Sequence, residues 1–136
     1  MAKTVQVAID CADPAALSRF WAAALGYVLN PPPEGHDSWE SWLSTMGVPE
    51  SEWNSASALI DPEGAGPRIY FQRVPEGKAG KNRLHLDVRV GGGRAGIGSE
   101  ADRLVALGAS VVGEKEERGE LWVVMQDPEG IEFCLT

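Results

Sequence analysis

The spacing of hydrophobic positions along the chain changes several times, and these changes predict its secondary structure. The β-branched run at residues 5–9 predicts a strand. Asp13 and Pro14 then predict a helix start, because a carboxylate N-cap and a proline in the first turn both suit a helix N-terminus. The apolar positions that follow recur at helical spacing up to Gly26, namely Leu17, Phe20, Trp21, Ala24 and Leu25. The chain therefore opens with a strand and an amphipathic helix that covers a sheet.

Three further strands are predicted at residues 27–29, 56–60 and 68–74, with an insertion between the first two of them. The insertion, residues 31–54, begins with three prolines that break regular structure, and we expect a short helix around residues 49–53. It holds three tryptophans in a polar context: Trp39, Trp42 and Trp53. Indole rings are seldom left in water, so these either pack the insertion onto the domain or a dimer interface, or line a ligand pocket.

The second half of the chain begins after a polar, glycine-rich linker at residues 75–82. A strand is predicted at residues 84–90, followed by a helix that Ser99 caps and Gly108 ends. Three more strands are predicted at residues 109–113, 121–126 and 131–136, and we expect the charged run at residues 114–120 to form a solvated turn.

The two halves repeat the same order of elements and the same short motifs. Ala-Leu-Gly occurs at residues 24–26 and 106–108, and Asp-Pro-Glu-Gly at residues 61–64 and 127–130. The sequence therefore predicts an α+β protein that is an internal duplication of a βαβββ unit. We expect a single domain over residues 1–136, with module one at about 1–77 and module two at about 81–136.

These motifs, together with Asn-Arg-Leu-His-Leu-Asp at residues 82–87 and Ile-Glu-Phe at 131–133, resemble the glyoxalase-like domains of the vicinal oxygen chelate superfamily. This superfamily also contains bleomycin resistance proteins and extradiol dioxygenases. The resemblance covers the whole chain and implies two tandem modules that form a curved mixed sheet around a cup. It also implies metal ligands on the first and last strand of each module, and a small organic molecule as substrate or ligand.

Carried onto this chain, the resemblance places metal ligands at His85 and Glu132 in module two. The equivalent positions in module one are Gln6 and Tyr70. Glutamine offers a carbonyl oxygen to a cation, whereas neutral tyrosine is a poor ligand, so the expected metal set is His85, Glu132 and Gln6. The cofactor is then one divalent ion such as Zn²⁺, Ni²⁺, Mn²⁺ or Fe²⁺, or none.

Three functional hypotheses follow from these residues. In the first, a bound metal assists lyase, isomerase or dioxygenase chemistry. In the second, His85 and Glu132 act without metal as an acid–base pair, and Tyr70 orients a substrate oxygen. In the third, the protein is a non-catalytic binder that sequesters a drug or antibiotic, with Trp39, Trp42 and Trp53 stacking on it.

The composition limits the classes of partner that the protein is expected to bind. The formal net charge of −8 disfavours binding to nucleic acid or to an acidic membrane. No apolar run approaches the length of a membrane span or a signal peptide, so we expect a cytoplasmic protein. Cys11 and Cys134 have no metal or redox spacing, and we expect two buried, reduced thiols. Because small domains of this kind cover their sheet edges by pairing, we also expect a homodimer.

Overall fold

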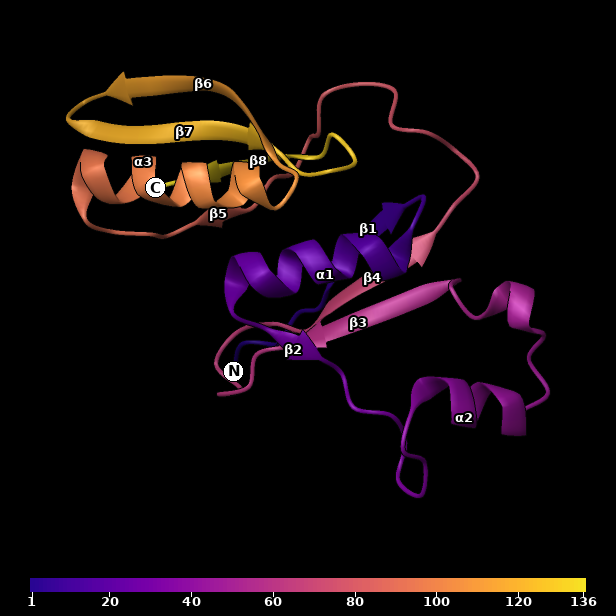
Figure 1. Cartoon of the computed structure of the whole chain (residues 1–136). Coiled ribbons are helices and arrows are strands. Elements are labelled where there is room, and N and C mark those ends of the chain that lie inside the picture. The colour runs from indigo at the N-terminus through magenta and orange to yellow at the C-terminus, as the bar shows by residue number, and fades with distance from the viewer. The chain divides into compact units, whose positions relative to one another are not determined.

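The computed structural model describes residues 1–136 and divides into two compact units, Met1–Gly77 and Lys78–Thr136. Each unit has its own four-stranded mixed sheet, with the strand order β1-β4-β3-β2 in the first and β5-β8-β7-β6 in the second. The first strand of each unit runs parallel to the last, and the other pairs are antiparallel. The predicted α+β fold with two βαβββ modules is therefore confirmed (Figure 1).

The hydrophobic core of the N-terminal unit lies between one helix and the four-stranded sheet. Its elements are β1 (Val7–Cys11), α1 (Pro14–Leu25), β2 (Val28–Leu29), β3 (Ala56–Ile60) and β4 (Ile69–Arg73). The Asp13 carboxylate accepts a hydrogen bond from the Ala16 N–H, and Gly26 ends the helix in the left-handed region at φ 72°. The side chains of Leu17 and Trp21 are fully buried on this helix. The helix boundaries and apolar face predicted from the sequence are thus confirmed.

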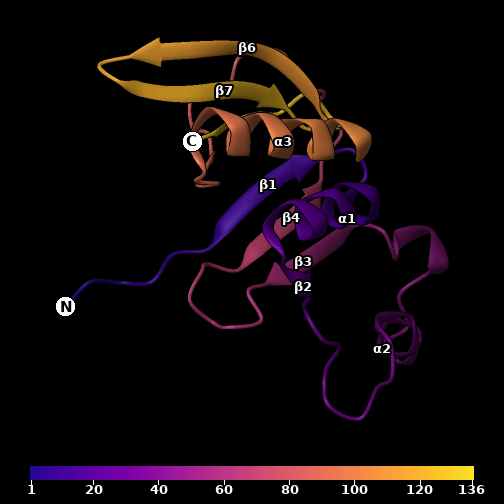
Figure 2. The ribbon, with the colours of Figure 1, turned by 60° about the vertical axis from the view of Figure 1, so that its left-hand side comes forward.

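The insertion between β2 and β3 contains more helix than the sequence predicts. It forms α2 (Trp39–Thr45), whose N-cap Ser38 accepts a hydrogen bond from the Ser41 N–H, and the short 3₁₀ helix η1 (Glu50–Glu52). In both ribbon views α2 lies away from the sheet of its unit (Figure 2). Trp39, Trp42 and Leu43 do recur at helical spacing in the sequence, at i, i+3 and i+4, although none of the residues of α2 is buried in the structure.

The C-terminal unit repeats the arrangement with β5 (Asp87–Val88), α3 (Gly93–Ala106), β6 (Ser110–Glu117), β7 (Glu120–Gln126) and β8 (Glu132–Leu135). The predicted start of its helix is wrong, because α3 is capped at Gly92 rather than at Ser99. The reason is local backbone geometry. A Cβ on Gly96 would lie 2.3 Å from the Gly91 carbonyl oxygen, so glycine allows the close turn with which the helix begins, whereas the glycine-rich sequence had predicted a flexible segment. Arg94 then pairs with Glu114 and Glu116 of β6.

The hairpin between β6 and β7 also differs from the prediction. The charged run expected to form a turn is mostly strand, and only Arg118 and Gly119 lie between the two strands. Both have positive φ, 53° and 78°. Two consecutive positive φ values match the twist of a hairpin, so a two-residue turn replaces the longer one. The charges of this segment therefore lie along an exposed ladder.

The Asp-Pro-Glu-Gly motifs form the same kind of turn in both units. Each aspartate accepts a hydrogen bond from the N–H two residues on, at 2.9 Å for Asp61 and 2.9 Å for Asp127. Asp127 is 3 % exposed and also accepts from the Ile131 N–H at 3.0 Å, which leads the chain into β8. The repeat in sequence is therefore a repeat of one turn before the last strand of each module.

Candidate ligand and metal site

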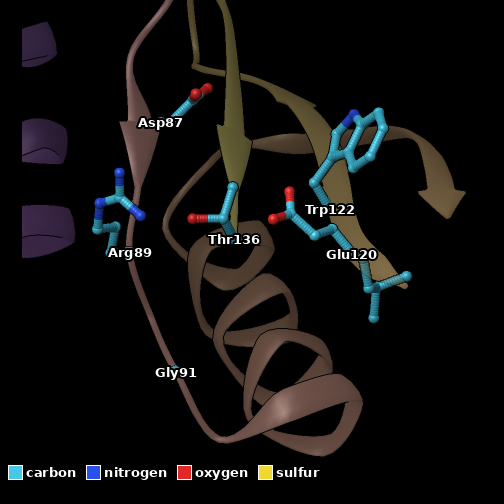
Figure 3. Close-up of a pocket in the computed structure, with 7 residues that line it drawn as sticks. Asp87, Arg89, Gly91, Glu120, Trp122 and Thr136 are labelled. Atoms are coloured by element: carbon cyan, nitrogen blue, oxygen red, sulfur yellow. The ribbon is translucent and has the colours of Figure 1, made fainter. Parts of the chain in front are cut away.

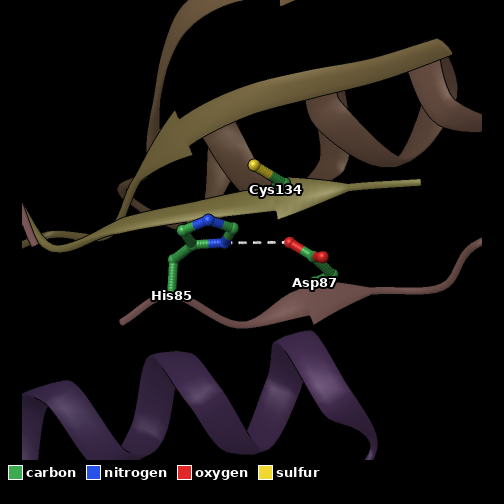
Figure 4. A group of neighbouring side chains, drawn as sticks. All are labelled: His85, Asp87 and Cys134. Atoms are coloured by element: carbon green, nitrogen blue, oxygen red, sulfur yellow. Dashed lines mark hydrogen bonds and ion pairs between the residues drawn. The ribbon is translucent and has the colours of Figure 1, made fainter. Parts of the chain in front are cut away.

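The histidine–carboxylate pair of the site lies at β5. His85 precedes this strand and Asp87 opens it, so strand alternation puts both side chains on one face. The His85 Nδ1 and the Asp87 Oδ1 are 3.0 Å apart (Figure 4). The two side chains are 43 % and 53 % exposed, so the pair is open to solvent and to a ligand. A carboxylate at this distance fixes the tautomer of the imidazole and leaves its second nitrogen available.

Cys134 joins this pair from the neighbouring strand. It is the register partner of Asp87 across the parallel β5–β8 ladder, and its N–H donates to the Leu86 carbonyl at 2.9 Å. The Cys134 Sγ, a nitrogen of His85 and a carboxylate oxygen of Asp87 all lie within 4.8 Å of one another. Burial, followed by the nearby Asp87 charge, raises the pKa of the Cys134 thiol. In the absence of a metal this thiol is therefore protonated at neutral pH, and both cysteines are buried and reduced, as predicted.

Glu132, the other residue expected at the site, has different partners. Its Oε1 is 3.0 Å from the Lys78 Nζ, and its Oε2 accepts a hydrogen bond from the Asn82 N–H at 3.2 Å. Burial acts to raise the pKa of Glu132, but the Lys78 hydrogen bond and backbone N–H groups together lower it below its ordinary value. His85 is thus paired with Asp87, and Glu132 holds the linker residues that lead into module two.

Gln6 and Tyr70 lie in the N-terminal unit, on either side of Arg68. The Gln6 Oε1 accepts from the Arg68 Nη1 at 2.7 Å, and the guanidinium carbon of Arg68 lies 5.7 Å from the Tyr70 ring centroid. This is a cation–π contact. Tyr70 pairs in register with Ala8.

The strand registers give a module-to-module correspondence different from the one predicted. Gln72 stands two residues after Tyr70, as Cys134 stands two after Glu132, and its register partner is Asp10 where that of Cys134 is Asp87. If Tyr70 matches Glu132, Asp10 therefore matches Asp87 and Ala8 stands at the position of His85. If Gln6 instead matches His85, Ala8 matches Asp87 and Tyr70 matches Cys134. The two predicted matches do not hold together, and the roles of Gln6 and Tyr70 stay predictions.

The three tryptophans of the insertion make contacts within the insertion and its flanks. Trp39 Nε1 donates to the Asn30 carbonyl at 2.7 Å, and Trp53 Nε1 donates to the Val48 carbonyl at 3.0 Å. The rings of Trp39 and Trp42 pack edge to face with centroids 5.7 Å apart. These contacts organise the insertion, and a role in binding a ligand stays a prediction.

A cleft in the C-terminal unit adjoins the His85–Asp87–Cys134 group. Its volume is about 560 Å³, and its lining residues are Asp87, Arg89, Gly91, Glu120, Leu121, Trp122 and Thr136 (Figure 3). Asp87 belongs both to this cleft and to the three-residue group. Trp122 was not among the residues expected at the site. The signal for it was the alternation along β7, where Val123 and Met125 are buried and Trp122 points to the opposite face.

Comparison with known proteins places this fold in a family. Residues 6–136 match the glyoxalase-like domain family. The chain therefore belongs to the glyoxalase-like domain family, as the sequence motifs indicated. A search of curated protein sequences finds no match.

Solved structures confirm the fold over nearly the whole chain. A glyoxalase/bleomycin resistance protein/dioxygenase family enzyme from Burkholderia phytofirmans is 17 % identical, with a TM-score of 0.67 and 98 % and 97 % of the two chains covered. A possible glyoxalase from Bacillus cereus is 13 % identical, with a TM-score of 0.66 and 100 % and 99 % covered. A fosfomycin resistance protein, FosX, from Listeria monocytogenes, complexed with Mn(II) and 1S,2S-dihydroxypropylphosphonic acid, is 12 % identical, with a TM-score of 0.67 and 99 % and 89 % covered. None of the helices of the present chain has the length and apolar character needed to cross a membrane.

Proposed function

We propose that this glyoxalase-like protein binds a small organic molecule in the cleft on the C-terminal sheet. The observation that carries the proposal is the position of Asp87, which lines the cleft and also pairs with His85. A molecule in the cleft therefore lies beside the one histidine–carboxylate pair of the site. A volume of about 560 Å³ is within the range of small-ligand pockets, roughly 300–1,000 Å³.

The lining of the cleft indicates the chemistry of its ligand. Trp122 offers a flat apolar surface, and Leu121 adds to it. Arg89 supplies a positive charge, whereas Asp87 and Glu120 supply two negative charges. A ligand with a planar or apolar body and polar groups at its edge satisfies these side chains, which matches the expectation of a small organic substrate or drug.

A catalytic role is favoured by one specific contact. The 3.0 Å contact between His85 Nδ1 and Asp87 Oδ1 leaves the His85 Nε2 free to take or give a proton. In that role His85 is the general base and Asp87 orients it. For Glu132 to act as a base or as the partner of His85, its carboxylate would have to leave Lys78. Tyr70 stays a candidate for orienting a substrate oxygen.

The test combines binding with turnover. A panel of aromatic carboxylates, phosphonates including fosfomycin, and aminoglycosides is titrated into the protein while tryptophan fluorescence is recorded, and the same mixtures are analysed by mass spectrometry. We expect saturable quenching by at least one compound, lost in Trp122→Phe and kept in the matched control Trp42→Phe. Quenching that survives Trp122→Phe but disappears in Trp42→Phe would move the site to the insertion and overturn the proposal.

The mass spectra separate the two roles. Product formation that His85→Ala abolishes and that Trp42→Phe leaves intact supports an enzyme. Binding without any product supports a sequestering protein.

A further inference from the structure

The side chains around Asp87 provide three metal-binding atoms of three different kinds. His85 offers an imidazole nitrogen, Asp87 a carboxylate oxygen and Cys134 a sulfur, and all three atoms lie within 4.8 Å of one another. Zn²⁺ holds such ligands at about 2.0–2.3 Å in tetrahedral geometry, which puts neighbouring ligand atoms about 3.3–3.8 Å apart. Contraction by about 1 Å, within the reach of side-chain rotation at exposed His85 and Asp87, brings the group to this geometry.

The backbone positions this group before any ion binds. Asp87 and Cys134 are direct partners in the parallel β5–β8 ladder, and the Leu86 carbonyl accepts from the Cys134 N–H at 2.9 Å. His85 stands two residues before Asp87 and shares its side of the strand. Asp87 and Cys134 therefore come from two adjacent strands that are fixed by hydrogen bonds, and His85 comes from the residues directly before β5.

We propose that His85, Asp87 and Cys134 form a metal site that selects a borderline-soft divalent ion such as Zn²⁺ over Mn²⁺. Thiolate ligands favour Zn²⁺, whereas Mn²⁺ prefers carboxylate, carbonyl and water oxygens. On binding, the Cys134 thiol releases its proton to solvent as the Sγ–metal bond forms. Three protein ligands leave one coordination position for water or substrate, and Asp87 lies at the border of the cleft.

This ligand set differs from the one that the family resemblance implies. Glu132 is bound to Lys78 and Asn82 in the structure, and Gln6 is bound to Arg68 in the other unit. The proposed ion is therefore held by residues of module two alone. The inference goes beyond the binding of an organic molecule, because a metal can occupy these residues whether or not the cleft takes a ligand. With the ion bound, His85 and Asp87 are its ligands and do not act as the metal-free base and its partner.

Cobalt spectroscopy tests the site without relying on activity. Chelator-treated protein is titrated with Co²⁺, and the absorption spectrum is recorded in the near ultraviolet, where thiolate-to-cobalt charge transfer appears, and in the visible. We expect a charge-transfer band that saturates at one ion per chain, that added Zn²⁺ abolishes, and that the same concentration of Mn²⁺ leaves in place.

Matched variants assign the ligands. Cys134→Ser should remove the band, and Cys11→Ser should keep it, because Cys11 is the other buried thiol but lies in the N-terminal unit. His85→Ala and Asp87→Ala should each weaken Co²⁺ binding by at least about 10–100-fold, the loss typical of removing even an outer partner of a metal site. Circular dichroism confirms that each variant is folded.

Several results would overturn the inference. These are the absence of a charge-transfer band in folded wild-type protein, loss of the band in Cys11→Ser but not in Cys134→Ser, and displacement of Co²⁺ by Mn²⁺ as readily as by Zn²⁺. Glu132→Gln gives a further outcome. Retention of the band supports the proposed ligand set, and its loss in a folded variant supports a site built on Glu132 instead.

Discussion

The ion pair between Lys78 and Glu132 allows a quantitative prediction, because it decides whether Glu132 is a structural or a reactive carboxylate. The two side chains are 25 % and 15 % exposed, with the charged atoms 3.0 Å apart. A hydrogen bond to a buried charged group contributes about 1.5–3 kcal/mol, and an exposed ion pair about 0–1 kcal/mol. At this intermediate exposure we expect Lys78→Met to lower the free energy of unfolding by about 1–2 kcal/mol, or the melting temperature by about 3–8 °C.

The pH dependence has a definite sign. The pKa of folded Glu132 lies below its ordinary value of 4.5, so the charged form is the one that stabilises the fold. This contribution is fully present above about pH 4.5 and is lost as the pH falls through the lowered pKa of the folded state. Glu132→Gln should therefore be less stable than the wild type at neutral pH, and the difference should disappear in acid.

Urea unfolding at a series of pH values, followed by circular dichroism, provides the measurement. Lys81→Met is the matched control, because Lys81 lies in the same linker and its Nζ donates only to the Asn82 carbonyl at 3.4 Å. The double variant Lys78→Met/Glu132→Gln should show a coupling of about 1 kcal/mol. If Lys78→Met is as stable as Lys81→Met, or if the Glu132→Gln difference is the same in acid and at neutral pH, the reasoning is wrong.

Two further predictions concern turns and caps. Asp127→Ala should lower the free energy of unfolding by about 1–3 kcal/mol, because its buried carboxylate accepts hydrogen bonds from two backbone N–H groups that would lose their partner. Asp61→Ala, at the more exposed equivalent turn, should cost less when both variants are compared by urea unfolding. Asp13→Ala should lower the free energy of unfolding by about 0.5–2 kcal/mol, because it removes the N-cap of α1. Asp13→Asn keeps a hydrogen-bond acceptor and should lower it less. Equal losses of stability in the two variants would show that the cap contributes little.

The duplicated architecture could be predicted from the sequence because its signals are local and occur twice. Apolar positions at helical spacing between Asp13 and Gly26 define α1, and the Asp-Pro-Glu-Gly turns mark the entry to the last strand of each module. The start of α3 could not be predicted, because it depends on how closely the Gly91 carbonyl approaches Gly96. A homodimer and a cytoplasmic location stay predictions, and light scattering on the purified protein tests the first of them.

For the site, the sequence by itself determined that His85 and Asp87 share one face of a strand, because alternation depends only on their spacing. Only the tertiary structure decided what stands beside them. The β5–β8 register puts Cys134 opposite Asp87, while the linker brings Lys78 to Glu132. The physical reason is that a strand's partner and its register are set by long-range hydrogen bonds, which leave no mark on the spacing of residues within one strand. In the sequence Glu132 is the expected ligand and Cys134 only a buried thiol, whereas in the structure Cys134 lies opposite Asp87 and Glu132 pairs with Lys78.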